Sequence, residues 1–321
     1  MGNFKKMKNI LVTGGTGFIG SNICKSLVKQ NYKLTIFDNN FRGKIKRLDE
    51  IKKKIRFVKG DIRNKKKLER SFKNIDTVIH LAFINGTQHF YDRPVDVMEV
   101  GIKGIFNVLE LSSKYKIKNF FLASSSEVYQ TPNKIPTDEN EMLKIPNIYN
   151  PRFSYGAGKI VSELMSIYYA RKKFKRLVIF RPHNVYSHDM GNEHVIPQFI
   201  KKISLSKNNG TIKIKGSGNE IRSFIHIDDF INAFNLIFHK GKNLEIYNIG
   251  TSEKISIKKV AMLIAKKIGK KVKLKKTNEF FGNTSIRCPN IKKITKLGFK
   301  QKINLSSGLD SVLKSIKNIK I

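Results

Sequence analysis

The sequence predicts an α/β protein built on a doubly wound parallel sheet, with a smaller lobe toward its C-terminal end. Two observations support this fold class. Up to Arg181, short apolar strands alternate with segments of helical apolar spacing, the order that gives a parallel sheet covered by helices on both faces. Beyond Arg181 the alternation loosens, and turns rich in Asn and Gly appear at residues 208–210 and 216–219.

The elements of the sheet can be placed in order from their apolar spacing. The expected strands are Ile10–Thr13, Leu34–Phe37, Ile55–Val58, Thr77–Leu81, Asn119–Ala123 and Leu177–Phe180. After the first strand, Ile19, Ile23 and Leu27 recur every four residues and predict one face of a helix. Longer helices are expected over Val95–Tyr115 and Tyr155–Arg171.

The smaller lobe is expected to be interleaved with the sheet domain. Residues 1–182 should form the sheet domain, joined by sheet segments from about 221–250. Residues 183–321 should form mainly the lobe, which includes a Lys-rich amphipathic helix near Ile257–Ile268 and a terminal helix over Asn304–Ile321. With 321 residues, of which 40% are hydrophobic, the chain can bury a sizeable core.

The composition excludes several classes of protein. The formal net charge of +39 comes from 63 Lys and Arg residues against 24 Asp and Glu residues, but the lysines are spread along the whole chain. Without a basic stripe that carries aromatic residues, we expect no nucleic-acid partner. No apolar run approaches the roughly 18–20 residues that span a membrane, and the basic segment Met1–Lys8 precedes a short strand rather than a signal-peptide core. A cytoplasmic protein is therefore expected, with Cys24 and Cys288 as free thiols.

A glycine motif directly follows the first strand. Gly14, Gly17 and Gly20 have a GxxGxxG spacing between a strand and a helix. Glycine lets a phosphate approach the backbone, and the start of the helix offers free N–H groups and the positive end of its dipole. This pattern predicts a Rossmann-type dinucleotide site.

The next strand ends in an acid, which bears on the cofactor. A carboxylate at Asp38 can accept hydrogen bonds from the adenosine ribose and would repel a 2′-phosphate, which favours NAD over NADP, although the nearby Arg42 weakens this preference. Asp61, after the third strand, is placed to contact the adenine amine, and its alternative is a helix-cap aspartate.

Tyr155 and Lys159 lie four residues apart and share one face of a predicted helix. A phenol has a pKa of about 10 and is a poor base at neutral pH, but a neighbouring ammonium and a nicotinamide ring would lower that pKa. A phenolate could then accept a hydroxyl proton as hydride passes to the cofactor. With the serine cluster at residues 124–126 upstream, this pair predicts nicotinamide-dependent redox chemistry.

In these motifs the chain resembles the extended short-chain dehydrogenase/reductase family, and within it the NAD-dependent nucleotide-sugar epimerases, dehydratases and decarboxylases. The matching segments run in family order at residues 14–20, 38, 60–62, 80–82, 124–129, 155–159, 181–186 and 222–229. The resemblance implies a nucleotide-diphosphate sugar as substrate, held under the C-terminal lobe, and a homodimer formed through the two long helices.

The resemblance also assigns roles to individual residues. Ser125, with Ser124 as the alternative, is expected to hydrogen-bond the reacting oxygen beside Tyr155 and Lys159. Glu127 is expected to be a further catalytic residue beside the sugar, with a plain strand-end carboxylate as the alternative. Substrate contacts are implied for Asn184, Arg222 and Arg287, and the cofactor contacts implied beyond the glycines, Asp38 and Asp61 are Thr16, Phe18, Ile19, Asn39, Ile62, Leu81, Ala82, Tyr155 and Lys159. No histidine forms a metal-ligand pattern with an acid, so no metal is expected.

Several reactions remain open at this point. The leading expectation is a 4-epimerase that works through a 4-keto sugar. Decarboxylation of a nucleotide-linked uronic acid is the alternative, because Ser126-Glu127 occurs in decarboxylases, while dehydratases show an Asp-Glu pair there. Dehydration across C4 and C6 and reduction of a 4-keto sugar are weaker alternatives. A protein that only senses nucleotides or associates with RNA is disfavoured by the presence of both Tyr155 and Lys159.

Overall fold

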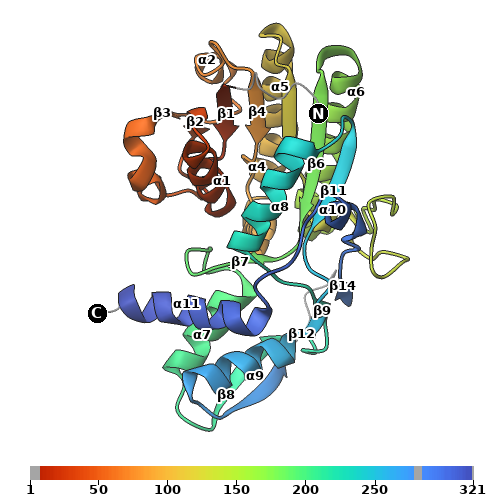
Figure 1. Cartoon of the computed structure of the whole chain (residues 1–321). Coiled ribbons are helices and arrows are strands. Elements are labelled where there is room, and N and C mark those ends of the chain that lie inside the picture. Colours follow the sequence, from red (N-terminus) through yellow and green to blue (C-terminus); the bar gives the residue numbers. More distant parts are fainter. Residues whose placement is uncertain (1–7, 278–283, 320–321) are drawn as a thin grey trace.

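A seven-stranded parallel sheet forms the centre of the protein (Figure 1). The structure, a computed structural model, describes residues 8–277 and 284–319. The strands are β1 (Asn9–Thr13), β2 (Lys33–Asp38), β3 (Ile55–Lys59), β4 (Thr77–His80), β5 (Asn119–Ala123), β6 (Arg176–Pro182) and β11 (Glu245–Ile249). The six expected strands are present within a few residues of their predicted bounds, and the fold class is confirmed.

The order of the strands creates a crevice. The sheet runs β11-β6-β5-β4-β1-β2-β3, so the chain winds from β1 toward β3 and then from β4 in the opposite direction. Ile10 of β1 pairs with Leu34 of β2 on one side and with Thr77 of β4 on the other. The connections therefore diverge at the carboxyl ends of β1 and β4, which is where ligands bind in doubly wound sheets.

Helices cover both faces of the sheet. One face carries α1 (Phe18–Lys29), the 3-10 segment η1 (Ile45–Lys54), α8 (Ile227–Lys240) and α10 (Lys292–Lys296). The other face carries α2 (Lys65–Glu69), α3 (Thr87–Asp92), α4 (Pro94–Glu99), η2 (Val100–Gly104), α5 (Ile105–Lys114) and α6 (Ser154–Lys173). Successive residues of a strand pack on opposite faces of the sheet: Ile10 and Val12 lie in the core on the first face, and Leu11 lies in the core on the second.

The helix expected over Val95–Tyr115 is present but is not a uniform α-helix. Its middle turn, η2, is a π-helix between α4 and α5. At that turn Gly101 lies against Gly158 of α6 and against the ring of Phe83. Apolar spacing reveals the length of such a helix but not a widened turn, and π turns often occur near functional sites.

The lobe has a core of its own below the sheet (Figure 1). Helices α7 (Val195–Leu205), α9 (Ile257–Ile268) and α11 (Leu305–Ile319) pack around the parallel pair β8 (Gly210–Lys215) and β13 (Val272–Thr277). The short elements that complete the fold are η3 (Ser126–Val128), η4 (Pro151–Phe153), β7 (Val185–Tyr186), β9 (Ile221–Arg222), β10 (Ile225–His226), β12 (Ile255–Ser256) and β14 (Ile286–Arg287). The sequence predicts a terminal helix that runs to residue 321. Helix α11 is described as far as Ile319, and residues 320–321 lie outside the described residues.

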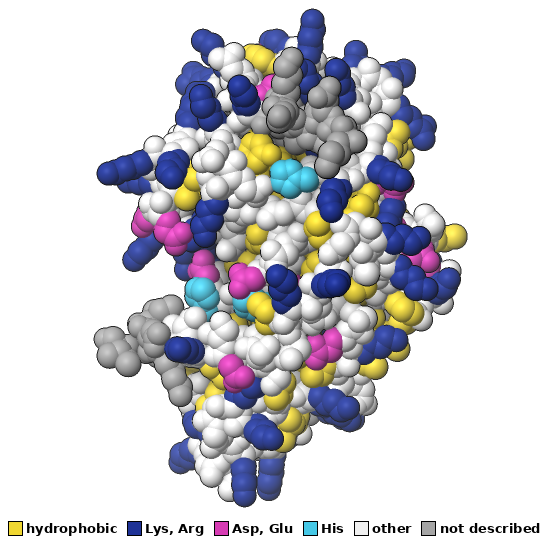
Figure 2. Space-filling view, viewed as in Figure 1, with side chains coloured by type: hydrophobic (Ala, Val, Ile, Leu, Met, Phe, Trp, Pro, Cys, Tyr) yellow, Lys and Arg dark blue, Asp and Glu magenta, His cyan; other side chains and the backbone are white. Residues whose placement is uncertain are grey.

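The surface agrees with a dispersed charge. Figure 2 shows Lys and Arg side chains scattered over the whole visible face rather than gathered in one patch. Within the described ranges, no helix is both long and apolar enough to cross a membrane.

Candidate active site

The glycine motif forms a close-fitting turn at the carboxyl end of β1. Gly14 has a φ of 77°, and a Cβ there would lie 2.6 Å from the backbone nitrogen of Ala82. A Cβ at Gly20 would collide with the carbonyl oxygen of Gly14. Helix α1 then begins at Phe18 with no side chain capping it, and the buried Thr16 hydroxyl finds no partner among the described residues. A backbone turn with open donors at a helix start fits the pyrophosphate of a dinucleotide.

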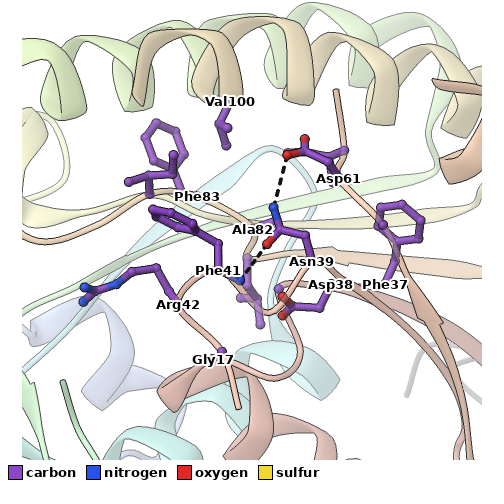
Figure 3. Close-up of a pocket in the computed structure, with 16 residues that line it drawn as sticks. Gly17, Phe37, Asp38, Asn39, Phe41, Arg42, Asp61, Ala82, Phe83 and Val100 are labelled. Atoms are coloured by element: carbon purple, nitrogen blue, oxygen red, sulfur yellow. Dashed lines mark hydrogen bonds between the residues drawn. The ribbon is translucent and has the colours of Figure 1, made fainter. Parts of the chain in front are cut away.

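The pocket at this turn contains most of the predicted cofactor residues. Figure 3 shows Asp38, Asn39, Asp61 and Ala82 around it, with Gly17 on the opposite side from Phe83 and Val100. The predicted cofactor residues among those that line it are Gly14, Gly17, Asp38, Asn39, Asp61, Ile62, Leu81 and Ala82. Thr16, Phe18, Ile19 and Gly20 lie in the adjoining turn and at the start of α1.

Asp38 is held in place by backbone donors. Its two carboxylate oxygens accept hydrogen bonds from the N–H groups of Thr16, at 2.9 Å, and Asn40, at 2.8 Å. Asp38 therefore joins the glycine turn to the segment after β2, with its carboxylate on the pocket wall.

We expect Asp38→Asn to weaken NAD binding and to lower the ratio of NAD affinity to NADP affinity by about tenfold. NADP should lose less affinity than NAD, because the charge that repels its 2′-phosphate is removed at the same time. NADP binding should show no net gain, since the new amide NH₂ would face a backbone N–H. Titration of the stripped protein with both cofactors measures the ratio. Asp76→Asn is the matched control, because Asp76 accepts from the N–H groups of Lys8 and Asn9 at the opposite end of β1. An unchanged ratio would contradict the interpretation of Asp38.

The carboxylate of Asp61 is held by two side chains that the sequence did not predict as its partners. Its carboxylate forms a two-point ion pair with Arg63, at 2.9 and 3.1 Å, and accepts from the Asn39 amide at 3.1 Å. Although burial acts to raise it, the pKa of Asp61 is lowered overall by its hydrogen bonds and its proximity to Arg63. Asp61 lines the pocket, so both alternatives, the adenine contact and a structural role, remain compatible with its position.

Two ion pairs connect the cofactor pocket to the loop that follows β7. Arg42 pairs with Glu193 at 3.0 Å, and Arg47 donates both to the carboxylate and to the carbonyl of Asp189, the latter at 2.7 Å. Arg47 also donates to the carbonyl oxygen of Thr16 in the glycine turn, at 3.3 Å. Arg42, which was expected to weaken the preference for NAD over NADP, therefore forms an ion pair with a residue of the lobe.

We expect Arg47→Ala to increase the rate of NAD dissociation about tenfold, because the glycine turn loses a charged donor worth about 1.5 kcal/mol. Displacement of bound NAD by a fluorescent analogue gives the rate. Arg56→Ala is the control, since Arg56 donates to the carbonyl of Arg70 on the surface of β3. Equal rates in both variants would remove Arg47 from cofactor retention.

The predicted catalytic residues meet beside this pocket. Lys159 donates from Nζ to the carbonyl oxygen of Ala123 at 2.6 Å, and its ammonium lies 4.2 Å from the centre of the Phe83 ring. The Tyr155 ring stacks on Phe90 with centroids 5.0 Å apart. Ser125 lies close enough to Tyr155 for its hydroxyl to act on the Tyr155 pKa, whereas the buried Ser124 hydroxyl has no partner among the described residues.

Burial opposes ionisation of both groups. Desolvation raises the pKa of Tyr155, which the Ser125 hydrogen bond partly offsets, and it lowers the pKa of Lys159 to about 7. Tyr155 therefore needs a further positive charge to act as a base near neutral pH, and the oxidised nicotinamide ring would supply one.

Glu127 is engaged on both sides by arginine. Arg152 donates to both carboxylate oxygens at 3.0 and 3.1 Å, and Arg287 donates to them at 2.6 and 3.3 Å. Against desolvation, the two guanidinium groups lower the pKa of Glu127 to about 2, with Arg287 the stronger influence. Glu127 is therefore an ionised partner in a buried ion-pair cluster, not a free acid.

The predicted substrate residues lie near one another. Arg222 of β9 and Arg287 of β14 are paired residues of neighbouring parallel strands. Proximity to Arg287 adds to the effect of burial in lowering the pKa of Arg222 to about 10. Asn184 donates its amide to the carbonyl of Ser223, the residue after Arg222.

The residues around Tyr155 and Glu127 that were not predicted from the sequence include Phe83, Phe90 and Arg152. Arg152 is three residues before Tyr155, and Phe83 is three residues past the end of β4 at the crevice, so position alone could have drawn attention to them. Gln130, which follows Tyr129, has a φ of 49°, in the left-handed region that favours glycine, and its side chain donates to the carbonyl of Glu127.

No group of three or more His, Cys, Asp or Glu residues that could hold a metal ion occurs within residues 8–277 and 284–319.

The chain matches the model of the family described as "NAD dependent epimerase/dehydratase family" over residues 10–250.

The similar proteins span more than one reaction. A candidate UDP-glucose 4-epimerase of Methanocaldococcus jannaschii is 36% identical over 314 residues, which cover 96% of this chain and 98% of that protein. A UDP-N-acetyl-alpha-D-glucosaminuronate decarboxylase of Bacillus cytotoxicus is 32% identical over 259 residues, covering 79% of this chain and 78% of the relative.

Among solved structures, the UDP-glucose 4-epimerase of Thermotoga maritima, determined with UDP-glucose, has a TM-score of 0.88 at 26% identity. The match covers 98% of this chain and 100% of the other. The glycine turn, the pocket and the extent of the family match lead to one conclusion: the chain is an enzyme of the NAD-dependent epimerase/dehydratase family, and NAD is its cofactor.

Proposed function

We propose that the enzyme interconverts the C4 epimers of a nucleoside-diphosphate sugar through a 4-keto intermediate. The Tyr155 phenolate removes the proton of the C4 hydroxyl, with Ser125 as its hydrogen-bond partner, while the C4 hydrogen leaves as hydride. Bound NAD supplies the hydride acceptor and, in the second half-reaction, the donor. Inversion requires that C4 be reduced on its opposite face, for which the bound cofactor would supply the hydride, and Tyr155 returns the proton to the oxygen.

The observation that carries this proposal is the state of Glu127. Removal of water across C4 and C6 needs a proton donor for the leaving hydroxyl. Glu127, whose pKa is lowered to about 2, is paired with Arg152 and Arg287, and the preceding residue is Ser126 rather than an acid. Epimerisation needs only one proton acceptor and donor at the C4 oxygen, which Tyr155 and Ser125 can provide.

The charge of the site favours a neutral sugar. Arg152, Arg222 and Arg287 bring three positive charges, and Glu127 brings one negative charge. The two negative charges of a diphosphate would complete the balance, and guanidinium forks suit phosphate oxygens. A uronic acid would add a negative charge without a counterpart, so epimerisation of a neutral hexose is favoured over decarboxylation.

The test is the identity of the product. We expect purified enzyme, incubated with nucleoside-diphosphate hexoses beginning with UDP-glucose, to form a product of unchanged mass with an inverted C4 centre by NMR. Deuterium placed at C4 should stay at C4, because the same hydride returns. Loss of carbon dioxide from a nucleotide-linked uronic acid would establish the decarboxylase instead, and loss of water would establish a dehydratase.

We also propose a homodimer formed through η2, α5 and α6. Ile102 and Phe106 on one helical segment and Leu164 and Tyr168 on the neighbouring α6 are large apolar side chains that are 38–58% exposed. A contiguous apolar face of this kind is typical of a subunit interface. Light scattering should give twice the chain mass, and the double variant Phe106→Ser/Leu164→Ser should give the monomer mass. Leu205→Ser, at another exposed site, should leave the dimer intact.

A further inference from the structure

The ring of Phe83 occupies a slot that only glycines allow. A Cβ at Gly101 of η2 would lie 2.6 Å from the ring tip of Phe83, and a Cβ at Gly158 of α6 would lie 2.9 Å from it. The ring tip is thus inserted where the two helices approach one another backbone to backbone. Its place on the pocket wall beside Val100 is visible in Figure 3.

From this slot Phe83 contacts both members of the Tyr–Lys pair. The Lys159 ammonium lies over the ring face, 4.2 Å from its centre, and the Tyr155 ring meets it edge-on with centroids 5.0 Å apart. Tyr155 also stacks on Phe90 at 5.0 Å, and the guanidinium of Arg152 covers Phe90 at 5.3 Å. Tyr155 therefore contacts two aromatic rings, and of these two Phe83 also touches Lys159.

We propose that Phe83 is a positioning residue that fixes Tyr155 and holds Lys159 in its charged form through the negative face of its ring. The proposal rests on the proposed roles of Tyr155 and Lys159, but not on which sugar reaction follows. An ammonium removed from water loses hydration, and an aromatic face restores part of that stabilisation. Burial lowers the pKa of Lys159 to about 7, so this support acts where the charge would otherwise be lost near neutral pH.

The other groups that face this pair do not replace the ring. Glu163, one turn along α6, favours the charged form of Lys159 but is itself paired with Arg181. His80 of β4 stays neutral, because burial and Lys159 lower its pKa to about 3. Around Tyr155, Ser125 is uncharged, and the opposed charges of Glu127 and Arg152 are already paired with each other.

The experiment changes the ring's charge distribution while its shape is kept. Incorporation of 3,5-difluorophenylalanine at position 83 weakens the negative face without a large change in size. The readout is NAD affinity as a function of pH in the absence of any sugar, since Lys159 is one of the predicted cofactor contacts. Phe90 carries the same fluorinated residue in the control, because it touches Tyr155 but not Lys159.

NAD affinity should fall as pH rises through the pKa of Lys159. Loss of the ring face lowers that pKa, so the fall should begin about half a pH unit earlier with fluorinated residue 83, and about one unit earlier in Phe83→Leu. The control at position 90 should match the native profile. The proposal would be overturned if the dependence of NAD affinity on pH were the same in all proteins, whether or not affinity changed with pH. It would also be overturned if fluorination at position 90 shifted that dependence as much as fluorination at position 83. Since no sugar is present, failure to find the substrate would leave this result unaffected.

Discussion

Tyr155→Phe is expected to lower kcat by roughly 10²–10⁴-fold, the range of general acid–base groups, while NAD affinity stays close to native. The phenyl ring keeps its stacking on Phe90 and its edge contact with Phe83, so the pocket should keep its shape. Only the oxygen that is proposed to exchange the C4 proton is lost. Turnover of the identified sugar nucleotide and a separate titration of NAD measure the two quantities.

The matched control is Tyr168→Phe, on the same helix but more than half exposed and outside the pocket. It should retain native turnover and native NAD affinity. If Tyr155→Phe turned over substrate at a near-native rate, the proton would have to travel by another group, and the proposed chemistry would be wrong. A parallel loss of NAD affinity would point to damage of the pocket instead.

Glu127→Gln is expected to destabilise the fold by about 3 kcal/mol at neutral pH, because two buried guanidinium groups lose their counter-charge. Arg152 and Arg287 are only 6% and 8% exposed. The folded pKa of Glu127, about 2, lies below the ordinary value of 4.5, so its stabilisation is complete above pH 4.5 and is lost as the pH falls toward 2. Denaturant unfolding at several pH values should show this acid-sensitive component in the native protein and not in the variant.

Glu110→Gln provides the comparison. Glu110 pairs with Lys65 on the surface, where both side chains are more than 40% exposed, and such pairs contribute about 0–1 kcal/mol. If Glu127→Gln were as stable as Glu110→Gln, the ion-pair cluster would have no structural role. Turnover of Glu127→Gln is expected to fall as well, whichever sugar reaction the enzyme performs, because Arg152 and Arg287, which are proposed to contact the substrate, lose their ion-pair partner.

The parts of this protein that depend on local chain pattern could be predicted from the sequence. Strands such as Leu177–Phe180 are buried on both faces, so they are continuous apolar runs, and the glycine turn and the Tyr155–Lys159 pair each lie within a few residues. The ion pair between Glu127 and Arg287 joins residues 160 positions apart, and the loop that carries Asp189 meets Arg47 only in the folded chain. Neither contact leaves a local signal, and the π turn at Gly101 packs against the ring of Phe83, which comes from another segment.

The late arrival of β11 in the sequence has a consequence for biosynthesis. Strand β6 is synthesised long before β11, which begins at Glu245 and pairs with it. Until β11 is made, the edge of β6 exposes unpaired backbone N–H and C=O groups beside Leu177–Phe180, which are buried in the complete fold. Helices α8 and α10, which cover the same face of the sheet, also come after Pro182. A fragment that ends at Pro182 would therefore keep an open, apolar sheet edge and aggregate. We therefore expect the sheet domain to fold only once the chain has been made as far as β11, well beyond the point where the alternation of strands and helices ends.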